Sequence, residues 1–170
     1  MEKARKRLSH ECLEERELLA IDLVQVNYFP TWDGNVIRST DVAGLTYHAP
    51  SGHLFLSDSE INETNHYQGV NVFEISLAGD QVFQEINTNN EEPTGITYSE
   101  FDGFFYISND SDDTITRYDE NFNPLLVVDT RLNPINAFDA EGIASNPTNG
   151  DLYVVDGADG NREVLTFDSN

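Results

Sequence analysis

Acidic or amide side chains recur at two matching positions in three segments of this sequence. One set stands three residues before a glycine and the other ends the apolar pattern that follows; with one further glutamate, the seven residues are Asp41, Asp58, Glu92, Asn109, Asp139, Glu141 and Asp156. Carboxylate and amide oxygens are hard ligands, and Ca²⁺ takes roughly six to eight of them. Because the chain has four histidines and one cysteine, zinc is less favoured. The pattern predicts that these seven residues bind a calcium ion.

A second interpretation of the same residues needs no metal. Asp and Asn side chains readily accept hydrogen bonds from nearby backbone N–H groups, and they are common where a strand passes into a turn. Converging carboxylates repel one another unless a cation or protons intervene. Turn capping and cation binding therefore both remain open for each residue. The three-dimensional surroundings of each side chain must decide between the two interpretations.

One histidine stands near the same end of the predicted strands. His66 lies in the long insertion at residues 59–69, SEINETNHYQG, and is the only histidine placed there. An imidazole beside a metal can act as a general base, so His66 is the candidate catalytic residue. An exposed loop histidine without a role is the alternative. The acidic run that begins at Asn109 lacks the glycine of an EF-hand loop, so it predicts no calcium loop of that kind.

The elements that position these residues are three copies of one sequence unit. The copies read DVAGLTYHAPSGHLFLSD from Asp41, EPTGITYSEFDGFFYISN from Glu92 and DAEGIASNPTNGDLYVVD from Asp139. In each copy a first glycine is followed eight residues later by a second, with short alternating apolar runs on both sides. This pattern predicts two antiparallel strands joined at a tight glycine turn.

Further alternating runs extend the unit to four strands in the first two copies, whereas the third copy ends before its fourth strand. A repeat of about 40–50 residues with four antiparallel strands is typical of a β-propeller blade. The predicted fold is all-β, with three four-stranded repeats over residues 41–91, 92–138 and 139–170. Propellers close with roughly four to eight blades, so three would form half of a six-bladed ring. Self-association of two copies could close that ring; alternatively, the chain is a fragment or relies on a different partner. A β-sandwich is the alternative architecture.

The residues before the repeats form two further segments. Residues 1–17 are rich in charge and predict a short helix, and residues 18–40 predict lead-in strands. The lead-in strands, expected at residues 18–26 and 35–38, could complete a neighbouring blade as its outer strands.

Composition narrows the classes of partner. The formal net charge is −22, which disfavours nucleic acid because a phosphate backbone needs a basic surface. Anionic membrane surfaces are disfavoured for the same reason, and a divalent cation is the natural partner. No apolar stretch has the length of a membrane span, and no signal peptide is visible at the N-terminus. The compartment is therefore unknown from the residues alone.

The repeat sequences resemble a known group of proteins. The segments DVAGLTYHAPSGHLFLSDSEIN, EPTGITY and DAEGIASNPTNGDLYVVDG are similar to blades of six-bladed calcium-dependent β-propellers. That superfamily includes senescence-marker/gluconolactonase proteins, paraoxonase-like lactonases, phytase-like propellers and NHL-type repeats. The resemblance implies calcium bound at the blade tops and a secreted or periplasmic location. The DAEG segment at residues 139–142 is similar to the acidic openings of phytase and lactonase blades.

Three functions are compatible with these observations. The first is a calcium-binding propeller module with a binding or structural role. The second is a calcium-dependent hydrolase of lactones or esters, in which the metal would polarise a carbonyl group. The third is a metal-free propeller that binds another protein. A phytase is weakly supported because residues 18–170 contain only four arginines and no lysine to hold phosphate.

Overall fold

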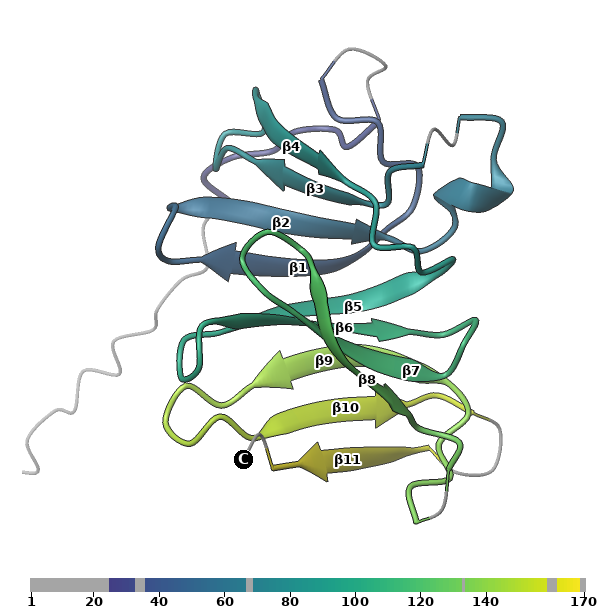
Figure 1. The fold of residues 1–170 in the computed structure, drawn as a ribbon. Helices are drawn as coiled ribbons and strands as arrows, with labels where there is room; N and C mark the ends of the chain where they lie inside the picture. The colour runs from purple at the N-terminus through teal and green to yellow at the C-terminus, as the bar shows by residue number, and fades with distance from the viewer. Residues whose placement is uncertain (1–24, 33–35, 67–68, 133, 159–161, 169–170) are drawn as a thin grey trace, which may run out of the picture.

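The computed structural model describes residues 25–32, 36–66, 69–132, 134–158 and 162–168. In this part of the chain the regular structure is almost entirely β, in three antiparallel sheets that stack in chain order (Figure 1). The prediction of an all-β fold is therefore confirmed. We call the three sheets the first, second and third blades.

Each of the first two blades has four strands in sequential order. The first blade contains β1 (Val42–His48), β2 (His53–Asp58), β3 (Val72–Ile75) and β4 (Val82–Ile86), with a short 3-10 helix η1 (Ile61–Glu63) after β2. The second blade contains β5 (Pro93–Ser99), β6 (Phe104–Asn109), β7 (Thr114–Tyr118) and β8 (Pro124–Asp129). The third blade differs, with only β9 (Ala140–Ser145), β10 (Leu152–Asp156) and β11 (Glu163–Phe167) in the described residues.

The second glycine of each copy makes the turn of the first hairpin. Gly52, Gly103 and Gly150 have φ angles of 73°, 77° and 79°, in the left-handed region that other residues rarely adopt. The predicted hairpin turns are therefore present in all three blades.

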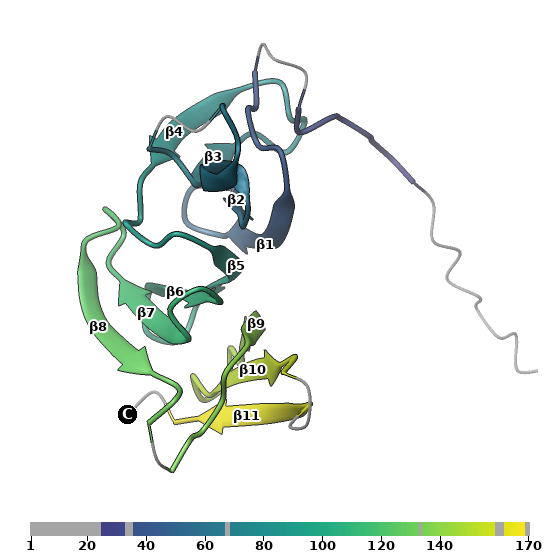
Figure 2. The ribbon, with the colours of Figure 1, turned by 90° about the vertical axis from the view of Figure 1, so that its right-hand side faces the viewer.

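The first glycine has a different task, which is to bring neighbouring blades together. A Cβ atom on Gly44 would lie 2.8 Å from the backbone nitrogen of Ile96, and one on Gly95 would lie 2.8 Å from that of Ile143. The inner strands β1, β5 and β9 therefore pack backbone to backbone. Figure 2 shows these three strands together on one side, with β4 and β8 on the other side, as in the fan of a propeller.

Apolar side chains fill the spaces between the blades. The core between the first and second blades contains Phe55, Ile96, Phe105 and Phe122, and the core between the second and third contains Tyr106, Ile115, Leu152 and Val154. A further cluster lies on the other face of the first blade, where Ile37 from the lead-in segment packs with Leu56 and Phe73. Burial of apolar surface thus holds the blades together, and hydrogen bonds such as Ser57 Oγ to the carbonyl of Thr94 (3.2 Å) and Thr94 Oγ1 to the carbonyl of Ala140 (2.9 Å) also join neighbouring sheets.

Other predictions meet the structure only in part. The predicted helix at residues 1–17 and most of the first lead-in strand lie outside the described residues. Of the second lead-in strand, the described part forms a single antiparallel bridge between Trp32 and Arg38. No helix of the described chain combines the length and apolar character that crossing a membrane requires.

Candidate metal centre

Three carboxylates converge on one rim of the stack. Asp110, Asp139 and Glu141 each offer an oxygen, and these oxygens lie within 4.8 Å of one another. They come from the end of β6 and from the start of β9, so the site joins the second and third blades. The strands β2 and β10 end on the same side, at the right in Figure 1, which faces the reader in Figure 2.

A repeated backbone hydrogen bond places the residues of this rim. The residue after the second strand donates its N–H to the carbonyl of the residue that opens the first strand: Ser59 to Asp41 (3.2 Å), Asp110 to Glu92 (3.1 Å) and Gly157 to Asp139 (3.0 Å). Ser59, Asp110 and Gly157 are therefore equivalent positions. Because only the second copy carries an acid there, the cluster forms at one place on the rim and not three times.

The electrostatic surroundings of the cluster disfavour its negative charge. Burial, together with hydrogen bonding to and repulsion by Asp139, raises the pKa of Asp110 to about 7, with further contributions from Glu92 and Glu141. Burial and then Asp139 also raise the pKa of Glu141. The interactions that raise these two pKa values include no basic group. A divalent cation bound among the carboxylates would relieve their mutual repulsion.

The charge extends beyond the three central residues. Burial raises the pKa of Glu92, and repulsion from Glu63, Glu60 and Asp139 adds to that rise. Acids from η1 and from the openings of β5 and β9 therefore influence one another across the same rim. The expectation that the acidic rows share one end of the blades agrees with this coupling.

The third blade contributes a buried carboxylate beside the cluster. Asp156 is 3% exposed and pairs with Ala140, the neighbour of both Asp139 and Glu141. Its Oδ1 accepts a hydrogen bond from the N–H of Ala158 (3.0 Å), whereas its Oδ2 has no partner among the described residues. A buried carboxylate oxygen without a donor is costly, and a cation is one means of satisfying it.

Close packing holds Asp139 in this arrangement. A Cβ atom on Gly157 would lie 2.7 Å from Oδ2 of Asp139, so the absence of a side chain at Gly157 makes room for the carboxylate. The glycine that follows Asp156 is therefore part of the site's geometry.

The first blade uses the equivalent of Asp156 quite differently. Asp58 is fully buried and accepts five hydrogen bonds. Its Oδ2 receives the Ser39 hydroxyl and the N–H groups of Thr40 and Asp41, and its Oδ1 receives the N–H groups of Glu60 and Ile61. Asp58 thus fastens the lead-in segment and η1 to the end of β2, as the capping interpretation proposed.

The remaining predicted ligands lie apart from the three converging oxygens. Asn109 accepts a hydrogen bond from the N–H of Glu92 (3.1 Å) and donates one to Asp112 (3.3 Å). Asp41 accepts a hydrogen bond from the Ser59 hydroxyl (3.3 Å). Of the seven predicted ligands, the structure brings Asp139 and Glu141 into the cluster, with Glu92 and Asp156 nearby.

Asp110 is the member of the cluster that the sequence analysis did not select. It stands in the acidic run after Asn109, which lacks the glycine of an EF-hand loop. Its equivalents in the other two copies are Ser59 and Gly157, so the repeat pattern contained no signal that could have singled it out.

His66 lies away from the acids of the cluster. Its imidazole ring is exposed and packs against Trp32, with 4.6 Å between ring centroids. His48 is the buried histidine, enclosed by Phe55, Tyr98 and Phe105, and burial lowers its pKa. A catalytic role for His66 stays a prediction.

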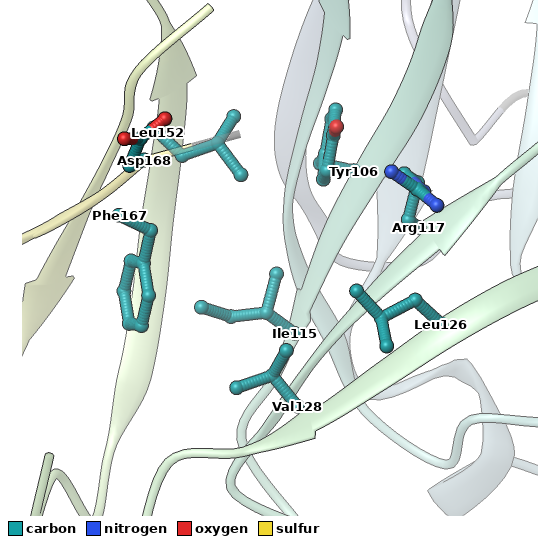
Figure 3. Close-up of a pocket in the computed structure, with 8 residues that line it drawn as sticks. All are labelled: Tyr106, Ile115, Arg117, Leu126, Val128, Leu152, Phe167 and Asp168. Atoms are coloured by element: carbon teal, nitrogen blue, oxygen red, sulfur yellow. The ribbon is translucent and has the colours of Figure 1, made fainter. Parts of the chain in front are cut away.

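One apolar groove is a consequence of how the blades pack. A groove of about 290 Å³ between the second and third blades is lined by Tyr106, Leu152 and Phe167, with Arg117 and Asp168 at its edge (Figure 3). In the first and second blades the equivalent side chains are Phe55, Phe105 and Tyr118, and the ring of Phe122 packs against all three. The groove is therefore the position that Phe122 fills one blade earlier.

The geometry of the cluster suits a calcium ion. Ca²⁺ binds oxygens at about 2.3–2.6 Å, so two oxygens on one ion stand at most roughly 5 Å apart. The 4.8 Å limit among Asp110, Asp139 and Glu141 is compatible with this span. Three carboxylates give between three and six oxygens, and waters or backbone carbonyls would complete the coordination.

Comparison with solved structures identifies the fold. The chain is similar to a chain of the nidogen/laminin complex (TM-score 0.60, 19% identity, 76% of this chain and 45% of that one). It is also similar to hydrazine synthase of Kuenenia stuttgartiensis (TM-score 0.58, 15% identity, 84% and 36%). A gluconolactonase from Xanthomonas campestris is a third (TM-score 0.52, 16% identity, 69% and 35%).

These similarities confirm the resemblance to propeller blades and go no further than the fold, because the identities are low. No family model and no curated protein matches the sequence. The chain spans less than half the length of each of the three solved chains. The described sheets are therefore a partial propeller.

Proposed function

We propose that this protein is a calcium-binding β-propeller module and that the ion binds on the rim between the second and third blades. The observation that carries the proposal is the convergence of Asp110, Asp139 and Glu141, whose oxygens lie within 4.8 Å of one another. The ion would link the end of β6 to the start of β9, so its role is to lock two blades together and to order their rim.

Two further features support a cation rather than protons as the natural partner. Among the described residues, Oδ2 of Asp156, on the strand beside β9, has no hydrogen-bond partner. Burial and then the neighbouring Asp139 raise the pKa of Asp110, and a cation would relieve the repulsion between these acids. The donors are all oxygens, which favour Ca²⁺ over metals that prefer imidazole or thiolate.

Thermal melting tests this proposal. After treatment with EDTA, addition of Ca²⁺ at a hundred times its dissociation constant should stabilise the folded state by about 2.7 kcal/mol. That corresponds to a rise in melting temperature of roughly 5–10 °C for a chain of this size. Glu100→Gln, an exposed acid in the turn between β5 and β6, is the matched control and should keep the full shift. No shift with wild type would favour the metal-free interaction module.

Hydrolysis of lactones or esters is the second candidate. The observation that favours it is the convergence of Asp110, Asp139 and Glu141, because a calcium ion held there would polarise the carbonyl group of a lactone or ester. Screening lactones and aryl esters in the presence of Ca²⁺ would test it. Turnover that Asp110→Asn abolishes would support an enzyme, whereas absence of turnover with every substrate would leave the binding module.

A further inference from the structure

The rear face of the first blade exposes side chains that the next blade buries. Leu45 and Tyr47 on β1 pair across the hairpin in the same register as Ile96 and Tyr98 on β5. Leu45 is 58% and Tyr47 51% exposed, whereas Ile96 is 3% and Tyr98 9% exposed. The difference arises because the second blade has a preceding blade packed against it, and the first blade has none over β1.

The forward face of the third blade shows the complementary pattern. Tyr153, Val155 and Val164 are 38%, 44% and 62% exposed, although the equivalent residues of the other two blades are at most 4% exposed. Those equivalents are Phe55, Ser57 and Val72 in the first blade and Tyr106, Ser108 and Ile115 in the second. An apolar face of this kind is costly to leave in water.

Gly142 on β9 stands at the position where the other two blades contact the next inner strand. Gly44 and Gly95 admit the backbone of the following inner strand, and a Cβ atom on either would collide with it. A Cβ on Gly142 would meet only the side chain of Val155, at 3.5 Å. Position 142 is therefore a glycine, as close contact between blades requires, although no blade of the described chain makes that contact with it.

The lead-in segment occupies the place of a fourth strand from a preceding blade. Ile86, at the end of β4, packs on the core that the first blade shares with the second. Ile37 packs in the same manner on Leu56 and Phe73 of the first blade. The third blade has three strands in the described residues. The lead-in segment on the first blade is therefore the kind of outer element that the described part of the third blade lacks.

We propose that a second copy of this chain covers both faces. The forward face of the third blade of each copy packs on the rear face of the first blade of the other, and the lead-in segment of each copy lies beside β11 of its partner. The dimer would contain two such junctions, and each would repeat the kind of contact that the chain already forms between its own blades. A two-fold axis then closes a six-bladed ring, within the range of roughly four to eight blades that propellers adopt.

Charge predicts how this association responds to salt. Each copy has a net charge of −22, so two copies repel one another at low ionic strength. The Debye length falls from about 30 Å at 0.01 M to about 8 Å at 0.15 M salt. We expect the apolar contact to strengthen as salt screens this repulsion.

Mass in solution tests the proposal directly. Light scattering over a series of protein concentrations, in 0.15 M and 0.5 M NaCl, should give twice the 19.1 kDa mass of the chain and nothing larger. Glu in place of Leu45 (L45E) or of Val155 (V155E) should give monomers, whereas L125E, an exposed leucine on β8, should stay dimeric. All three positions are exposed, so circular dichroism should stay unchanged.

Mixing the two variants separates ring closure from other dimers. L45E keeps its forward face and V155E keeps its rear face, so an equal mixture can form one native contact and should yield a heterodimer by native mass spectrometry. A wild-type monomer at every concentration, an open-ended series of oligomers, or a dimer that only one of the two variants abolishes would overturn the proposal. The result is independent of calcium binding, because the experiment is made with EDTA present.

Discussion

Asp58 and Asp156 end the second strand of their blades at the same position, and yet their surroundings differ sharply. Asp58 accepts five hydrogen bonds, whereas within the described part of the chain Asp156 accepts one and its Oδ2 has no partner. The first carboxylate is satisfied by the lead-in segment and η1. The second lies beside Asp139 and Glu141, where the available groups are other acids. A repeated acid is therefore a structural cap in one blade and a candidate ligand in another.

The largest expected effect comes from removing the cap. Asp58→Ala leaves several buried donors without an acceptor, and each costs roughly 1–3 kcal/mol. We expect the free energy of unfolding to fall by about 3–5 kcal/mol and the melting temperature by roughly 10 °C, with the same loss with or without Ca²⁺. Thermal melting in EDTA and in Ca²⁺ measures both.

The control for this variant is Asp80→Ala, an exposed turn residue of the first blade. If Asp58→Ala left stability in EDTA unchanged but removed the calcium shift, Asp58 would be a ligand and the contrast with Asp156 would be wrong.

Removing charge from the cluster should weaken calcium binding without lowering the stability of the calcium-free protein. In Asp110→Asn and Glu141→Gln, loss of one carboxylate relieves repulsion, so the EDTA-treated protein should melt at or above the wild-type temperature. Calcium affinity should fall by about 10- to 100-fold, as expected for loss of a charged contact of roughly 1.5–3 kcal/mol. Calorimetric titration measures the affinity. Affinity equal to that of wild type in both variants would contradict the site.

The fold was more predictable from the sequence than the site. Gly44 and Gly95 recur because the inner strands approach closely there, and Gly52, Gly103 and Gly150 recur because their turns have a positive φ. Such backbone demands act within one blade or between identical neighbours, so they repeat in the sequence. The three hairpins and their stacking follow from them.

The ligands depend on contacts that do not repeat. Asp139 and Glu141 were among the predicted ligands and lie in the cluster, whereas Asp110 was not selected because its equivalents in the other copies are Ser59 and Gly157. Asp58 and Asp156 look alike in sequence, and only the lead-in segment packed on the first blade distinguishes them. The three described strands of the third blade agree with the sequence, whose third copy ends before a fourth strand.

A smaller effect is expected from pH. The pKa of Asp110 is raised in the folded protein, so its contribution to stability is present below its unfolded pKa and is lost as pH rises through about 7. In EDTA, wild type should therefore lose stability between pH 5 and pH 8 relative to Asp110→Asn. The comparison with the variant cancels His48, whose lowered pKa acts in the opposite direction.

Melting temperatures at half-unit pH steps measure this difference. Identical pH profiles for wild type and Asp110→Asn would show that Asp110 carries no unfavourable charge. Asp110 would then be a structural carboxylate like Asp58, and the contrast between the two sites would be wrong.

The smallest effect should come from a change without charge. Gly157→Ala places a methyl group where the carboxylate of Asp139 now lies, so that side chain must turn away. We expect calcium affinity to fall by about 10-fold, the lower range for groups that orient metal ligands, with little change in EDTA stability. Gly79→Ala would be a poor control because of its positive φ, so Ala158→Ser serves instead. Unchanged affinity in Gly157→Ala would show that Asp139 is not held by this packing.

A crystal structure with bound calcium, or with a lanthanide located by its anomalous signal, tests the central claim most directly. The account predicts one ion on the rim between the second and third blades, within about 2.3–2.6 Å of oxygens from Asp110, Asp139 and Glu141. An ion bound at Asp58 instead, or a well-ordered rim without any ion at saturating calcium, would contradict it.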